Sequence, residues 1–165
     1  MSGVMDAWEN TRLPTAYLSR YCLAGSDGRT ILNYAQWTHS DAHRAFATNP
    51  QNQQTLGTAI QGLFTAGPPG RYTLYRSITL REAAVRYFTT ASYDTEASQT
   101  ARARADTLAT RSAAAAPSGL IAEHFHISED GHRLYVLSAH ETEPDEATPR
   151  FLPYRGLARR RPVAT

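Results

Sequence analysis

The chain has 165 residues, 41% hydrophobic and 19% charged, a composition typical of a globular protein rather than a disordered one. Its net charge of +2 is too small to indicate a nucleic-acid partner. It contains no apolar run of the roughly 18–20 residues that a membrane span needs, and its first residues lack a signal-peptide layout. The single cysteine, Cys22, excludes an internal disulfide, so we expect a cytoplasmic protein.

The first half of the chain predicts a β-hairpin followed by helices. The pair Asp27-Gly28 is a hairpin-turn signal because glycine tolerates positive φ. A run rich in β-branched and aromatic residues follows it and ends at Trp37. The expected elements are a helix at 4–12, a strand at 15–23, a strand from the turn to Trp37, helices at 40–48 and 51–64, and a strand at 71–78.

The second half predicts a strand, a long helix and a second hairpin. Asp94-Thr95, with an acidic residue behind it, is typical of a helix start. The Ala-rich stretch that follows is broken by Pro117. The expected elements are a strand at 83–93, a helix from 94–95 to about 116, strands at 120–128 and 133–140, a turn at 143–147 and a short closing strand at 150–157.

Asn33 and Trp37 share one face of the predicted hairpin strand, because residues two apart on a strand point the same way. Between them stands the small Ala35, which leaves room for a flat ligand beside an amide and an indole N–H. The alternative is that Asn33 satisfies a backbone group and Trp37 packs in the core.

The stretch DGRTILNYAQW at residues 27–37, with a predicted helix directly after it, resembles the antibiotic biosynthesis monooxygenase family. Members of that family have a ferredoxin-like α+β fold and usually pair into a dimeric α/β barrel. The best-known members oxidise aromatic polyketide intermediates, such as anthrones, with O2 and without metal, flavin or haem. An Asn and a Trp four residues apart lie in their active site. The resemblance therefore implies that Asn33 and Trp37 are catalytic, with O2 as co-substrate and no cofactor.

The order of elements predicts an α+β fold made of two fused, degenerate ferredoxin-like halves of the βαββαβ type. Segment 130–136 repeats the turn placement of segment 27–33, which indicates an internal repeat. We expect a first half at 1–79 that lacks its first strand, a second half at 80–157 and a basic tail at 158–165. The halves would face each other as a pseudo-dimeric barrel. Alternatively, one half is peripheral and the chain forms a homodimer through the other, since the missing strand leaves an open edge.

Four further residues are candidates for substrate binding. Tyr21 stands where the family often has a histidine, on the strand before the turn. His124 and His126 alternate on a predicted strand and are either a general base or ordinary hydrogen-bonded histidines. Arg86 shares a predicted strand face with Ala84 and Phe88, which we expect to point inward. There it would neutralise a phenolate or carboxylate of a ligand, or pair with a glutamate.

One pocket and no metal are expected. In the repeat register, Asn33 aligns with Val136 and Trp37 aligns with His140, so the second half lacks the donor pair. His140 with the two strand histidines offers imidazole ligands, but no carboxylate or cysteine stands at a supporting spacing. His43, on a polar helix, is expected to be solvated.

The sequence thus predicts a cofactor-independent monooxygenase that oxidises an aromatic polyketide of the anthrone or phenol type with O2. It leaves open a non-redox polyketide cyclase or lyase that uses His124 or His126 as acid or base. A haem-degrading relative also remains open, as does a non-catalytic module that binds a hydrophobic small molecule or stabilises a partner enzyme.

Overall fold

The structure is a computed structural model, and it describes residues 11, 13–61, 67, 70–144 and 149–153. The predicted helix at 4–12 and the basic tail at 158–165 lie outside these residues, except for Thr11. The chain is an α+β protein that divides into two compact units. The first comprises residues 1–22, 33–69 and 154–165, and the second comprises residues 23–32 and 70–153.

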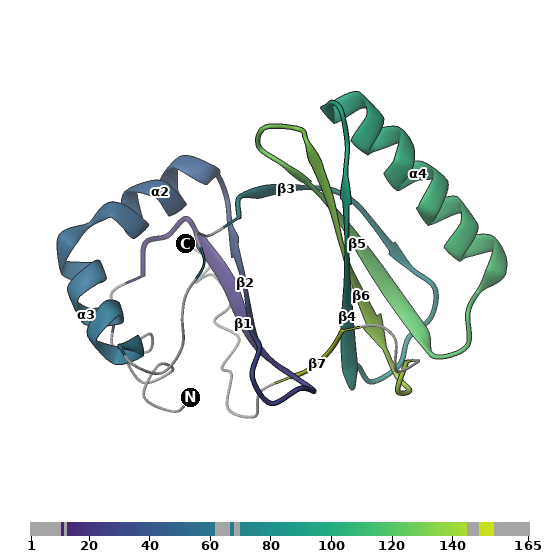
Figure 1. Ribbon diagram of the computed structural model, residues 1–165, viewed down its shortest axis with the longest axis horizontal. Helices are drawn as coiled ribbons and strands as arrows, with labels where there is room; N and C mark the ends of the chain where they lie inside the picture. Colours follow the sequence, from purple (N-terminus) through teal and green to yellow (C-terminus); the bar gives the residue numbers. More distant parts are fainter. Residues whose placement is uncertain (1–10, 12, 62–66, 68–69, 145–148, 154–165) are drawn as a thin grey trace. The chain divides into compact units, whose positions relative to one another are not determined.

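The first unit contains most of the predicted hairpin and two helices (Figure 1). The hairpin strands are β1 (Tyr17–Gly25) and β2 (Ile31–Trp37), whose turn end, residues 23–32, belongs to the second unit. They are followed by α2 (Ser40–Thr48), as predicted, and α3 (Pro50–Ile60). Proline suits the first turn of α3 because its missing N–H would be unpaired there anyway.

The second unit is an antiparallel sheet with one long helix. Its elements are β3 (Tyr72–Thr79), β4 (Tyr87–Asp94), α4 (Ser98–Ala115), β5 (Leu120–Ser128), β6 (Arg133–His140) and β7 (Arg150–Pro153). The strand order is β2-β1-β7-β4-β6-β5-β3, in which the turn end of β1 pairs with β7, Gly25 opposite Phe151. The predicted strands at 120–128 and 133–140 are confirmed residue for residue.

The helix α4 lies on one face of this sheet (Figure 1). It packs there through a stripe of alanines. Ala101, Ala105 and Ala109 recur every four residues and are at most 1% exposed. Spacing by four places all three on the same side of the helix. They pack against Phe125, Ile127, Leu134 and Val136 of β5 and β6. Small side chains let the helix backbone lie close to the sheet, and this contact forms the core of the second unit.

Two predicted elements begin several residues later than expected, and at the start of α4 tertiary hydrogen bonds are the reason. Asp94 does not start α4 but ends β4, where it pairs with Arg133. The backbone N–H of Thr95 then donates to the carbonyl of His132, so α4 begins only at Ser98. The strand predicted to begin at residue 83 starts at Tyr87.

The two hairpin turns that the sequence aligns share their local geometry. Gly28 and Gly131 have φ of 67° and 77°, the left-handed region that glycine adopts without strain. The Asp27 carboxylate accepts from the backbone N–H of Arg29, and Asp130 accepts in the same way from His132. The hydroxyl of Thr30 also donates to Asp27, and that of Ser128 donates to Asp130. These side-chain hydrogen bonds, with the backbone ones, hold the pKa of Asp27 at about 2 and lower that of Asp130.

Candidate functional site

Asn33 is held by an arginine that the sequence analysis did not single out. Its side chain is solvent-exposed on β2, and its Oδ1 accepts a hydrogen bond of 2.7 Å from Nη2 of Arg20 on β1. Arg20 is only 7% exposed, and burial lowers the pKa of its guanidinium. The signal that could have revealed it is a lone arginine within the otherwise uncharged strand that precedes the hairpin turn.

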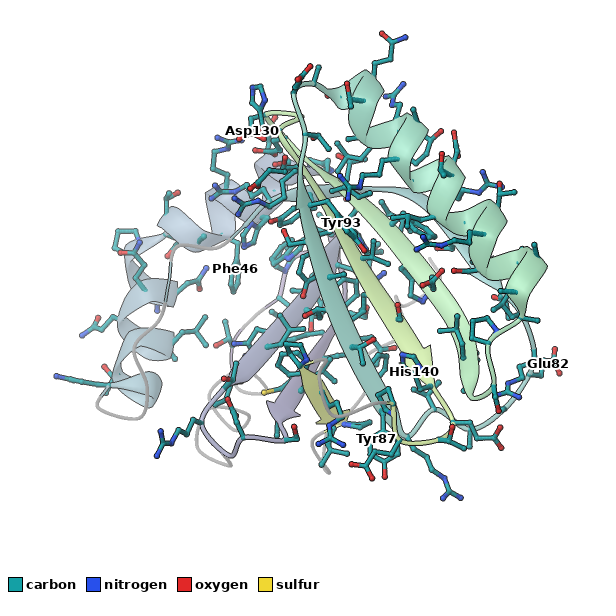
Figure 2. The ribbon with its side chains drawn as sticks, turned by 45° about the vertical axis from the view of Figure 1, so that its right-hand side comes forward. Phe46, Glu82, Tyr87, Tyr93, Asp130 and His140 are labelled. Carbon is teal, nitrogen blue, oxygen red and sulfur yellow. The ribbon has the colours of Figure 1, made fainter. Side chains whose placement is uncertain are left out.

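Trp37 lies in an aromatic cluster. Its ring centroid is 5.3 Å from that of Tyr17 in an edge-on contact, and 5.2 Å from those of His43 and Phe46 of α2. Phe46 is buried (labelled in Figure 2), and His43 is half-buried, so the prediction that His43 is solvated was wrong. His43 and Phe46 are three residues apart and therefore share one face of α2. That face is turned towards Trp37 of β2, which the prediction did not take into account.

The indole Nε1 of Trp37 is buried and has no hydrogen-bond partner among the described residues. A buried N–H without an acceptor costs about 1–3 kcal/mol, so tryptophan N–H groups inside proteins usually have one. A carbonyl or phenolate oxygen of a bound molecule would satisfy this donor.

Tyr21 lies on the opposite face of the hairpin from Asn33. Its ring centroid is 6.4 Å from that of Tyr34, which is adjacent to Asn33 in β2 and therefore points the other way. On the same face as Tyr34, the hydroxyl of Ser19 donates to Oε1 of Gln36 at 2.5 Å. The structure therefore brings Asn33 together with Arg20 and does not bring it together with Tyr21.

His124 and His126 lie on one face of β5 in the second unit. Nδ1 of His124 is 2.9 Å from the hydroxyl of Ser77 on β3. His126 is buried, and this burial lowers its pKa to about 4; burial also lowers the pKa of His124. A histidine with such a pKa is neutral at pH 7, so it can act as a base but carries no positive charge for an anionic substrate.

The expected inward position of Arg86 was wrong. Arg86 precedes β4, and both it and Ala84 are exposed, while Phe88 is half-buried. The backbone N–H of Arg86 still donates to the carbonyl of His140, which continues the pairing of β4 with β6. Its side chain is nevertheless exposed, because the strand predicted to begin at residue 83 is absent over residues 83–86.

A polar groove of about 580 Å³ lies at the turn end of the β5–β6 hairpin. Asp130, which is labelled in Figure 2, is among the residues that line it. It is lined by charged residues, among them Arg71, Glu129 and Arg133, whose guanidinium is paired with Asp94. None of the six predicted site residues lines it. A groove lined by charged residues differs from the apolar pocket that an aromatic substrate requires.

Within the described ranges, no group of three or more histidine, cysteine or acidic side chains is placed to hold a metal ion. No helix among the same residues is long and apolar enough to cross a bilayer.

Comparisons with known proteins give a fold and no family. No protein-family model matches the sequence, and no curated protein is significantly similar to it. A solved structure of an anthrone oxidase-like protein has the same fold, with a TM-score of 0.66. The alignment covers 93% of this chain and 86% of that chain at 12% sequence identity. The chain is therefore similar in architecture, across nearly its whole length, to that α+β protein.

Proposed function

We propose that this chain is a cofactor-independent oxygenase of the antibiotic biosynthesis monooxygenase type, acting on a fused-ring phenol of the anthrone class in the cytoplasm. The observation that carries the proposal is the exposed amide of Asn33, held by Arg20 on the same face of β2 as Trp37. The shared architecture with an anthrone oxidase-like protein supports it.

The reaction balances without an external reductant. Anthrone and O2 give the quinone and water, and the four electrons that reduce O2 all come from the substrate. Loss of a proton from the methylene carbon gives an electron-rich enolate, which passes one electron to O2. The two radicals combine into a C–O bond, and the resulting peroxide takes up a proton. Elimination of water then breaks the O–O bond, removes the second methylene hydrogen and forms the new carbonyl.

In this reaction the protein has to stabilise an anion and remove a proton. The Asn33 amide would donate to the substrate oxygen as it becomes the enolate oxygen, the charge-stabilising role of an oxyanion hole. Trp37 would donate its buried indole N–H to a second oxygen or bind the flat ring by stacking. We assign the general base to His43, which contacts Trp37 through its ring.

Oxygen uptake by the metal-stripped protein tests this function. Dithranol, a dihydroxyanthrone, is the substrate, and each reaction is run with and without chelator. Asn33→Ala removes the amide donor and Trp37→Phe removes the indole donor. The matched control is Gln36→Ala, which removes an amide from the opposite face of the same strand.

Chelator-resistant uptake should fall about 100-fold in Asn33→Ala and remain near wild type in Gln36→Ala. Wild-type uptake no faster than that of dithranol in buffer would reject the oxygenase. A loss in Gln36→Ala with none in Asn33→Ala would move the site to the Tyr21 face of the hairpin. Turnover of the substrate without O2 consumption would identify the cyclase or lyase instead.

A further inference from the structure

Arg20 is a buried cation that holds the side chain of an exposed residue. At 7% exposure its guanidinium is largely removed from bulk water. Its Nη2 donates a hydrogen bond of 2.7 Å to the neutral amide oxygen of Asn33, Oδ1. Tyr17 and Cys22 also lie near enough to affect the pKa of Arg20. The hydrogen bond therefore links a buried, charged anchor to an exposed amide.

The chemistry of the pair leaves the Asn33 amide a single orientation. A guanidinium offers only N–H donors and has no acceptor. Only the oxygen of the Asn33 amide can face it, so the NH2 group must point away from Arg20. A charged donor also polarises the amide, and this makes the two N–H groups better donors.

Without that anchor, the amide loses its direction. An exposed asparagine samples several rotamers, and its χ2 torsion is broad and close to two-fold, so oxygen and NH2 exchange places readily. An amide oxygen turned towards a developing enolate would repel it. Pre-orientation of the donor is what makes a hydrogen bond effective in a transition state, because no reorganisation is then needed during the reaction.

We propose that Arg20 is a positioning residue, which fixes the Asn33 amide with its NH2 group directed at the oxygen of a phenolic substrate. This inference rests on the proposed function for its catalytic consequence. Its structural part, the orientation of the amide by a guanidinium, can be measured without turnover.

Arg20→Met and Arg20→Lys test the inference, with thermal melts to establish folding. Methionine keeps an unbranched apolar stem of similar reach and removes every donor, whereas lysine keeps a single charged donor. The spectroscopic readout is the side-chain ¹⁵NH2 pair of Asn33, assigned by its disappearance in Asn33→Ala. We expect this pair to shift strongly in Arg20→Met and less in Arg20→Lys.

The kinetic readout is a double-mutant cycle on dithranol oxidation. Arg20→Met should lower kcat at least tenfold with KM changed less than threefold, and Arg20→Lys should recover part of the loss. Because Arg20 acts through Asn33, Arg20→Met should cost less than twofold in an Asn33→Ala background.

The outcomes separate the two proposals. A wild-type protein that consumes no O2 rejects the proposed function and the catalytic part of this inference together. Wild-type turnover with full kcat in Arg20→Met, or with additive losses in the cycle, rejects the positioning role alone. Unchanged Asn33 NH2 resonances in Arg20→Met reject the orientation itself. If neither variant folds, Arg20 is a structural residue and the inference is wrong.

Discussion

His126 on β5 lies directly opposite Tyr135 on β6, with ring centroids 6.4 Å apart. The imidazole is 5% exposed, and the cost of desolvating its charged form lowers its pKa to about 4. Burial also lowers the pKa of His124 and that of His140. The second unit therefore holds three histidines that resist protonation.

We expect acid to destabilise the fold between pH 6.5 and 4. In that window the unfolded chain binds a proton at residue 126 and the folded chain does not, so stability rises with pH. The shift from 6.5 to about 4 corresponds to roughly 3 kcal/mol, lost progressively as the pH falls. Urea unfolding at pH 7 and pH 4.5 measures it. His126→Phe should flatten the dependence, whereas His39→Gln, at an exposed position, should leave it as steep as in the wild type.

Enlarging the alanine stripe of α4 should push the helix off the sheet. Ala105 has 0% exposure and packs among the core residues of β5 and β6, so Ala105→Leu should cost about 1–3 kcal/mol through overpacking. Ala103→Leu makes the same change at an exposed position of the same helix and should stay within about 0.5 kcal/mol. Thermal melts measure this difference, and we expect a lower melting temperature for Ala105→Leu than for Ala103→Leu. Equal melting temperatures would mean that α4 is not seated as described.

The two turn glycines should differ in their tolerance of alanine. Gly28→Ala places a Cβ in open space, so only the positive φ is penalised, at about 1–2 kcal/mol. In Gly131→Ala the added Cβ also comes within 2.9 Å of the backbone nitrogen of Ser98, where α4 begins. We therefore expect Gly131→Ala to lose more stability, and to lose helix signal with it. Similar unfolding free energies for the two variants would contradict this.

Removing His43 should slow oxidation in a way that an added base restores. A general base typically contributes about 10²–10⁴-fold, so His43→Ala should lower kcat at least 100-fold. The deletion leaves space beside Trp37, and imidazole in the buffer should recover part of the rate. A Tyr17→Phe variant keeps the aromatic contact with Trp37 and should remain active. Loss of activity in both variants without imidazole rescue would assign His43 a packing role only.

Local rules predicted most of the strands and their turns. Asp27-Gly28 and Asp130-Gly131 predicted hairpin turns because only glycine adopts the required positive φ at little cost, and both glycines do so. Alternation placed Asn33 and Trp37 on one face of β2, and β-branched composition located β5 and β6. Local composition was less reliable at Asp94, where pairing with Arg133 on a distant strand outcompeted a helix cap.

The surroundings of the candidate site were decided by tertiary structure alone. The sequence by itself determined that Asn33 and Trp37 share one face of a strand, because that depends only on the two-residue period of the backbone. It did not determine that Arg20 orients the amide or that His43 packs on the indole. Those contacts depend on the register of β1 against β2 and on the angle at which α2 leaves the strand. Both are set by packing between segments, which no local pattern records.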